Sequence, residues 1–91
     1  MAIHPTAVIE TGARIHATAD IGPFCIIGPK TVIGPGTKLL HSVTVAGRTT
    51  LGARNVVHPY AVLGGDPQDL KYKGEDSVLV IGDENMIREG A

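Results

Sequence analysis

The stretch IGPFCIIGPKTVIGPG (Ile21–Gly36) contains the triplet Ile-Gly-Pro three times, and each copy starts six residues after the previous one. The same spacing extends in both directions, because every sixth position from Ile3 to Leu63 holds Ile, Leu or Val. Most positions two residues before these aliphatic residues are small, as at Ala19 and Cys25. A repeat of this regularity determines the fold before any local motif is considered.

A helix does not produce a period of six residues, because helical stripes recur at three and four. Six is a multiple of two, so a short β-strand presents the same face in every repeat, while Gly and Pro once per period indicate a turn. Three such units close a coil of about 18 residues, and coils stack as parallel strands about 4.8 Å apart. The sequence therefore predicts an all-β fold, a parallel β-helix of about five coils.

Residues 18 positions apart are predicted to stack in three ladders that fill the interior of this β-helix. The three ladders are Ile3, Ile21, Leu39 and Val57; Ile9, Ile27, Val45 and Leu63; and Ile15, Ile33 and Leu51.

The repeat stops after Leu63, where the next two positions are Asp69 and Glu75, and it returns at Ile81 and Ile87. Carboxylates cannot enter a dry interior without a large free-energy cost. We therefore predict one external loop over residues 64 to 77, after which Ile81 continues the third ladder.

A long loop on a regular solenoid is usually functional, although a tolerated surface insertion is the alternative. Its polar side chains suit a polar, phosphorylated ligand, because lysine offers a point charge to phosphate, and amide and carboxylate groups bind sugar or base hydroxyls and amides. The spacing of these residues does not name a reaction.

The composition excludes several classes of function. Lys and Arg number 8 against 9 Asp and Glu, and aromatic residues are 3%, so nucleic acid and anionic membranes are not expected partners. No apolar stretch reaches the roughly 18–20 residues that span a bilayer, and the N-terminal residues lack a signal-peptide pattern. The single Cys25 excludes an internal disulfide, and a cytoplasmic location is expected.

Four histidines, His4, His16, His41 and His58, lie just after repeat positions, where the chain turns a corner. We interpret them as solvent-exposed corner residues, and Cys25 as a packing residue in a small-residue position. An apolar environment raises the pKa of a thiol and argues against its use as a nucleophile.

Three segments, IGPFCIIGP (Ile21–Pro29), PQDLKYKGE (Pro67–Glu75) and VIGDENMIRE (Val80–Glu89), resemble the acyl-carrier-protein:UDP-N-acetylglucosamine O-acyltransferases of lipid A biosynthesis. Many acyl- and nucleotidyltransferases share the six-residue repeat, whereas the loop motif is more specific and argues against the related N-acyltransferase. The resemblance implies a left-handed β-helix in a cytoplasmic homotrimer without metal or organic cofactor. It also implies further coils and a C-terminal helical domain beyond Ala91.

Such enzymes transfer a 3-hydroxyacyl chain from acyl-carrier protein to the 3-hydroxyl of UDP-N-acetylglucosamine, the first step of lipid A biosynthesis. By resemblance, Gln68, Asp69 and Lys71 are the expected substrate-binding residues, in a groove between subunits. The attacking hydroxyl needs a general base. The family's catalytic histidine lies beyond Ala91, so no catalytic residue is expected in these 91 residues, and little activity is expected from them alone.

Two other functions stay open at this stage. The chain could be a non-catalytic scaffold or trimerisation module, for which the outward-facing Val8, Val32 and Val56 are candidate interface residues. It could also be a different acyl- or sugar-nucleotide transferase on the same scaffold, which the specific loop motif disfavours.

Overall fold

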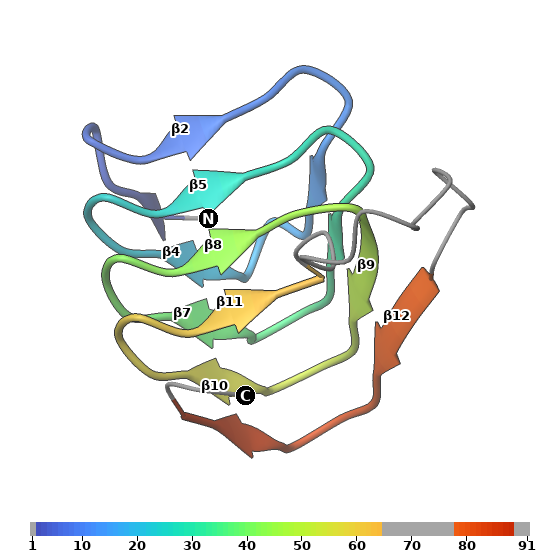
Figure 1. Ribbon diagram of the computed structural model, residues 1–91. Helices are drawn as coiled ribbons and strands as arrows, with labels where there is room; N and C mark the ends of the chain where they lie inside the picture. The colour runs from blue at the N-terminus through green and yellow to red at the C-terminus, as the bar shows by residue number, and fades with distance from the viewer. Residues whose placement is uncertain (1, 65–77, 89–91) are drawn as a thin grey trace.

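The computed structural model describes residues 2–64 and 78–88, and the chain in these ranges winds into a β-helix (Figure 1). Thirteen short parallel strands form within them. The strands are β1 (Ala2–Ile3), β2 (Val8–Ile9), β3 (Arg14–Ile15), β4 (Asp20–Ile21), β5 (Ile26–Ile27), β6 (Val32–Ile33), β7 (Lys38–Leu39), β8 (Thr44–Val45), β9 (Arg48–Leu51), β10 (Val56–Val57), β11 (Val62–Leu63), β12 (Val78–Ile81) and β13 (Met86–Ile87).

Three parallel sheets form the sides of the β-helix. The first sheet has the order β1-β4-β7-β10-β13, the second β11-β8-β5-β2, and the third β12-β9-β6-β3. Consecutive strands therefore always belong to different sheets, and β13 opens a fifth coil. Backbone hydrogen bonds join the coils, as where the Val8 N–H donates to the Cys25 carbonyl (2.8 Å) and the Ile26 N–H to the Val43 carbonyl (2.9 Å).

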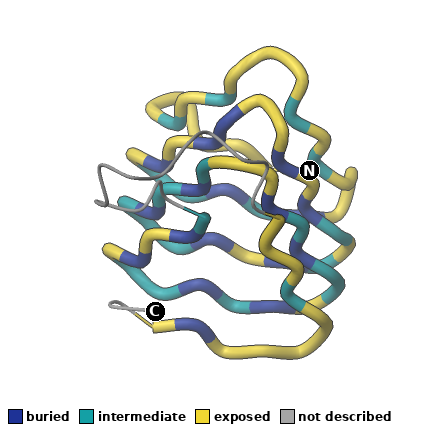
Figure 2. The backbone as a smooth tube through the Cα atoms, turned by 45° about the vertical axis from the view of Figure 1, so that its right-hand side comes forward, coloured by how far each residue is buried: buried dark blue, intermediate teal, exposed yellow. Residues whose placement is uncertain are grey.

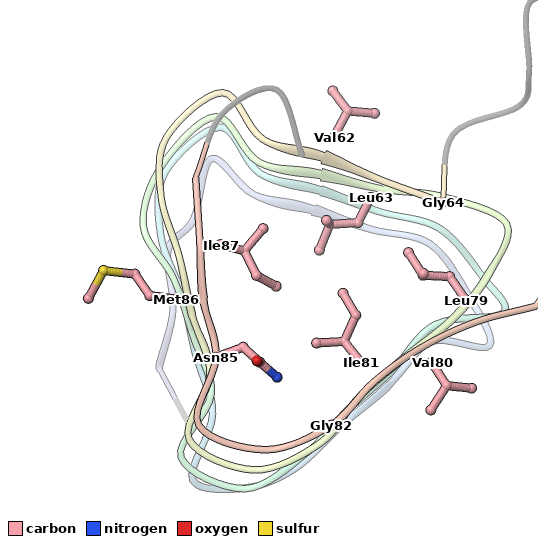
Figure 3. Close-up of a pocket in the computed structure, with 10 residues that line it drawn as sticks. All are labelled: Val62, Leu63, Gly64, Leu79, Val80, Ile81, Gly82, Asn85, Met86 and Ile87. Carbon is pink, nitrogen blue, oxygen red and sulfur yellow. The ribbon is translucent and has the colours of Figure 1, made fainter.

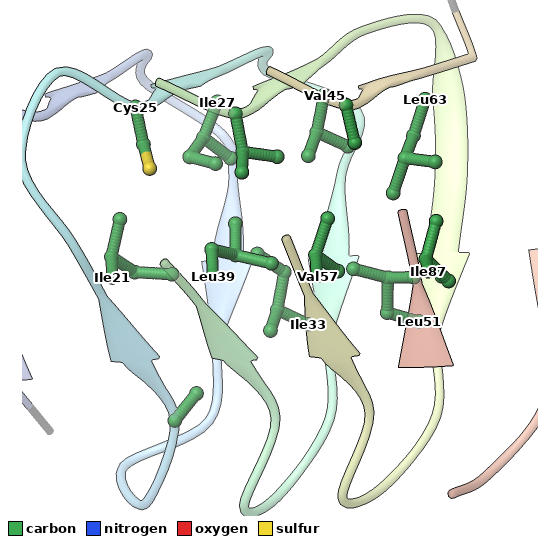
Figure 4. Close-up of a cluster of buried hydrophobic side chains, with 13 residues drawn as sticks. Ile21, Cys25, Ile27, Ile33, Leu39, Val45, Leu51, Val57, Leu63 and Ile87 are labelled. Atoms are coloured by element: carbon green, nitrogen blue, oxygen red, sulfur yellow. The ribbon is translucent and has the colours of Figure 1, made fainter. Parts of the chain in front are cut away.

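The register confirms the three predicted ladders. Within residues 2–63, paired strand residues lie 18 positions apart, as in Ile21↔Leu39, Ile27↔Val45 and Ile33↔Leu51. The aliphatic side chains at these positions meet in the interior, as Figure 4 shows. In the central coils they are at most 3% exposed. Removing this apolar surface from water is the dominant favourable contribution to folding.

In the central coils, from Ala19 to Ala61, the positions two residues before each ladder residue are also buried. Among the polar residues there, Thr37 and Thr49 form hydrogen bonds with the backbone of a nearby turn, whereas Thr31 Oγ1 is buried and has no hydrogen-bond partner among the described residues. Thr37 Oγ1 donates to the Gly52 carbonyl and Thr49 Oγ1 to the Ala46 carbonyl, both at 2.7 Å. These bonds satisfy polar groups that would otherwise be costly to bury.

The strand β12 returns the chain to the β-helix as predicted. It pairs with β9 in the register Leu51↔Ile81, and β13 pairs with β10 in the register Val57↔Ile87. Ile81 packs against the core, which confirms that it continues the third ladder. The predicted external loop covers residues 64 to 77, and residues 65–77 of it lie outside the described residues.

Burial decreases towards the two ends of the β-helix (Figure 2). Ile3, in the first coil, is 36% exposed, whereas its ladder neighbour Ile21 is 2% exposed. The inner coils have a neighbour on both sides, and the first coil has one among the described residues.

The inward and outward isoleucines of β5 should differ in how much stability is lost when each is truncated to alanine. Ile27→Ala should lower the free energy of unfolding by about 2–4 kcal/mol, because Ile27 is fully buried and its truncation leaves a cavity. The matched variant Ile26→Ala removes a side chain that is 44% exposed and should cost less than about 1 kcal/mol. Urea unfolding of both variants measures the difference, and equal losses would contradict the assigned faces.

Candidate functional site

The predicted binding residues Gln68, Asp69 and Lys71 lie outside the described residues, so their role stays a prediction. The structure does describe Gly64 and Val78, the two residues that flank this segment. Their surroundings show how the β-helix holds both ends of it.

Gly64 sits at the first end in a backbone conformation that other residues rarely adopt, with φ at +68°. A β-carbon at this position would overlap the Thr49 hydroxyl and the Ala46 carbonyl. Close approach and a left-handed φ together require glycine here. The chain therefore leaves the β-helix in tight contact with residues 46 to 49 of the preceding coil.

Val78 follows residues 65–77 and is the first residue of β12. It pairs with Arg48 in β9. Gly64 and Val78, which flank residues 65–77, thus lie at the same corner of the same underlying coil. Four consecutive residue pairs, Arg48–Leu51 against Val78–Ile81, fix the register of the returning chain.

The turn after β12 is fixed by the fully buried Asn55. Its Nδ2 donates to the Gly82 carbonyl (2.7 Å), and its Oδ1 accepts the Asn85 N–H (2.8 Å). Asp83 Oδ1 accepts the Ala53 N–H (2.7 Å) in the same turn. Asn55 therefore uses both ends of its amide to hold the returning chain.

Sequence reasoning did not single out Asn55. The available signal was that Asn55 and Asn85 precede the ladder residues Val57 and Ile87 by the same two positions. A polar residue in a row of small buried ones indicates a hydrogen-bonding role.

A pocket of about 500 Å³ opens at this end of the β-helix (Figure 3). Leu63, Ile81 and Ile87 point into its interior, whereas Val62, Val80 and Met86 point outward. The lining is mainly apolar, and Asn85 contributes an amide. Such a surface suits packing against another apolar layer, and it offers no acid–base pair for chemistry.

The prediction of four solvent-exposed corner histidines is correct for His4 and His16 and wrong for His41 and His58, which are half-buried. His4 and His16 belong to the first coil, which stacks against only one other coil among the described residues. His41 and His58 lie in inner coils, which are covered on both sides. The His41 ring packs edge-on against Tyr60 with ring centroids 5.5 Å apart.

The two exposed histidines, His4 and His16, form hydrogen bonds within their own turns. His4 Nδ1 lies 2.8 Å from Thr6 Oγ1, and His16 Nδ1 lies 2.9 Å from Thr18 Oγ1. The Nε2 of His58 is buried and has no hydrogen-bond partner among the described residues. Within residues 2–64 and 78–88, no histidine is paired with a carboxylate that would orient it as a general base.

Cys25 is fully buried, consistent with its interpretation as a packing residue. Desolvation by burial raises the pKa of its thiol, against smaller lowering contributions from backbone hydrogen bonds with Val43, Gly22 and Ser42. A buried neutral thiol is a poor nucleophile.

In the described part of the chain, no group of three or more His, Cys, Asp or Glu side chains is arranged to hold a metal ion. No helix in the same residues is long and apolar enough to cross a membrane.

Residues 6–41 and 30–65 match the bacterial transferase hexapeptide family (six repeats), and together they cover about two thirds of the chain. The chain belongs to this family. Its repeat is the one that forms the three ladders.

Two curated relatives are named acyl-[acyl-carrier-protein]–UDP-N-acetylglucosamine O-acyltransferase. The one from Psychrobacter sp. is 53% identical over 96% of this chain and 34% of its own length, and the one from Myxococcus xanthus is 56% identical over the same shares. The crystal structure of the UDP-N-acetylglucosamine O-acyltransferase from Moraxella catarrhalis is similar with a TM-score of 0.92 and 47% identity, over 98% of this chain and 35% of that chain.

The chain spans about a third of the length of the curated relatives it matches. These similarities confirm the predicted left-handed parallel β-helix and the resemblance stated from the sequence.

The close approach of Gly64 to Thr49 and Ala46 can be tested by adding a β-carbon at position 64. Gly64→Ala should cost at least about 2 kcal/mol of unfolding free energy, because it combines a left-handed φ with overlap at Thr49 and Ala46. Gly82→Ala is the matched control, since its new β-carbon would meet nothing within 4 Å, and it should change stability by less than about 0.5 kcal/mol. Thermal and urea unfolding report both, and a neutral Gly64→Ala would refute the close approach.

Proposed function

We propose that this chain contributes the N-terminal part of an enzyme that transfers a 3-hydroxyacyl group from acyl-carrier protein to the 3-hydroxyl of UDP-N-acetylglucosamine. The observation that carries the proposal is the 47–56% identity to acyltransferases of this name over nearly the whole chain. The segment QDLKYKGE, at the interruption of the repeat, supports the same activity over a generic hexapeptide transferase.

In this proposal the described residues position the substrate-binding segment rather than perform the chemistry. Gly64 and the strand β12 hold the ends of the segment at one corner, and Asn55 fixes the turn that follows β12. Gln68, Asp69 and Lys71 are the proposed contacts with the nucleotide sugar. An amide, a carboxylate and an ammonium group supply both donors and acceptors for hydroxyl and phosphate groups.

The general base comes from residues beyond Ala91 in this proposal, because no described histidine is paired with a carboxylate that would orient it. The proposed enzyme is a cytoplasmic homotrimer of lipid A biosynthesis, with its site between subunits. Outward-facing valines support an interface, since Val8 is 53% and Val32 39% exposed, while Val56 is half-buried. Further coils and a C-terminal helical domain would complete each subunit.

The alternative function is a non-catalytic trimerisation scaffold. A scaffold needs the ladders but has no use for a polar segment whose two ends are held at one corner. The two functions therefore differ in what the side chains of residues 68 to 71 do.

Replacing Gln68, Asp69 and Lys71 together with alanine in the full-length protein should reduce affinity for UDP-N-acetylglucosamine at least tenfold. Each lost charge-assisted hydrogen bond is worth about 1.5–3 kcal/mol. Isothermal titration measures binding, and light scattering measures the oligomeric state, which should not change. Undiminished binding and turnover by the triple variant would contradict the proposed site.

A further inference from the structure

Two corners of the first coil carry the same pair of side chains, a histidine followed two residues later by a threonine. In the first pair, His4 Nδ1 lies 2.8 Å from Thr6 Oγ1, and the Thr6 N–H donates to the same nitrogen at 3.2 Å. In the second pair, His16 Nδ1 lies 2.9 Å from Thr18 Oγ1 and accepts the Thr18 N–H at 3.1 Å. The same arrangement therefore occurs independently at two corners, and we call these residues the two His–Thr pairs.

Each threonine hydroxyl also contacts the second coil. The Phe24 N–H donates to Thr6 Oγ1, and the Gly36 N–H donates to Thr18 Oγ1, both at 3.0 Å. Donor and acceptor lie 18 positions apart, so each bond joins equivalent corners of neighbouring coils. The two His–Thr pairs thus attach the first coil, at the N-terminal end of the β-helix, to the second (Figure 1).

The inner coils make the same connection with backbone atoms alone. The Ser42 N–H donates to the Pro23 carbonyl at 2.9 Å, and the Arg54 N–H donates to the Pro35 carbonyl at 2.8 Å. These two donors follow the corner donors of the second coil by 18 residues. The side-chain connection is therefore a feature of the first coil, and the matching backbone connection one coil further on does not involve a histidine.

The difference follows from the conformation of the turns. Phe24 and Gly36 have left-handed φ values of +60° and +68°, whereas Thr6 and Thr18 do not have a positive φ. A left-handed residue at this place of a turn reverses the orientation of the peptide before it. In the first coil the threonine hydroxyl, rather than that peptide carbonyl, accepts the N–H from the next coil.

The arrangement requires an unprotonated Nδ1. A backbone N–H can only donate, so Nδ1 of His4 and of His16 accepts, and the ring proton of the neutral side chain lies on Nε2. Protonation of the ring adds a hydrogen to Nδ1, which then faces the threonine N–H, and two donors form no hydrogen bond. The arrangement is therefore complete while the ring is neutral, and it is lost as the pH falls through the range in which histidine titrates, between about pH 8 and pH 5.

The turns stacked on the two histidines carry almost no titratable groups. Residues 22–25 stack on the turn of His4, and their one titratable side chain is the buried Cys25 thiol. Residues 34–37 stack on the turn of His16 and have no titratable side chain. The histidines are thus the groups at these corners that change charge near neutral pH.

The strands beside these turns add two charged residues. Arg14 lies two residues before His16 and pairs with Val32. Asp20 pairs with Ala2 on one side and with Lys38 on the other. Within residues 2–64 and 78–88, neither histidine forms an ion pair, so the bonds to threonine are the contacts that titration of the rings alters.

We propose that the two His–Thr pairs form an acid-sensitive attachment of the first coil to the second. At neutral and higher pH each histidine holds the threonine in place for the N–H of the second coil. In acid the threonine loses its bond to the ring, and the corner opens to solvent more often. The proposal concerns the N-terminal end of the β-helix and does not depend on the proposed acyltransferase activity.

Amide hydrogen exchange of the isotope-labelled full chain, measured by NMR and corrected for the intrinsic effect of pH, tests the proposal. Between about pH 8 and about pH 5, the protection factors of the Phe24 and Gly36 amides should fall about two- to tenfold, as the loss of one hydrogen bond implies. The Arg54 amide is the matched internal control, because it makes the same connection to a backbone carbonyl. Unchanged protection of Phe24 and Gly36, or an equal loss at Arg54, would overturn the proposal.

Two variants separate titration of the rings from other effects of acid. In the double variant His4→Asn, His16→Asn, an amide oxygen replaces Nδ1 as the acceptor and does not titrate. The protection of Phe24 and Gly36 should then be the same at both pH values, and a persisting pH dependence would contradict the proposal.

Thr6→Val removes the hydroxyl of one pair and keeps the shape of the side chain. It should lower the protection of Phe24 at both pH values and leave that of Gly36, which belongs to the other pair, unchanged. Undiminished protection of Phe24 in this variant would also overturn the proposal. Urea unfolding of each variant checks that the β-helix is intact.

Discussion

Stacking of one coil on the next depends on two interactions that require the same register. Backbone N–H groups of one coil donate to carbonyl groups of its neighbour, and the inward aliphatic side chains of both coils meet in the interior. A slip by one residue would break both at once, because it would turn every inward side chain outward. The insertion after Leu63 increases the sequence separation between paired residues from 18 to 30, as in Leu51↔Ile81. This change is compatible with the register. The added 12 residues equal two repeats of six, so the inward face is preserved.

The β-helix thereby positions the two residues that flank the polar segment, Gly64 and Val78. Glycine at position 64 and the paired strand β12 hold its two ends at one corner, and Asn55 locks the next turn. Equivalent positions of neighbouring coils lie side by side in a solenoid. A residue type that recurs at one position of the repeat therefore forms a charged or apolar stripe along the surface.

The ladders and the return at Ile81 could be predicted from the sequence because each inward position has one requirement, an aliphatic side chain, and the requirement recurs at a fixed period. Handedness came from resemblance, since the same period fits either hand. The half-burial of His41 and His58 could not be predicted, because it depends on which coils cover each corner. Gln68, Asp69 and Lys71 lie in a segment whose sequence has no six-residue period, so the repeat does not predict their positions.

The chain returns from the insertion two repeats later and in the original register. Backbone nuclear Overhauser contacts measured on the isotope-labelled protein test it most directly. We predict contacts between the backbone protons of Leu51 and Ile81 and between those of Val57 and Ile87, as the paired strands require. Contacts of Leu51 or Val57 with residues shifted by one or two positions, or with residues 69 and 75, would contradict the account.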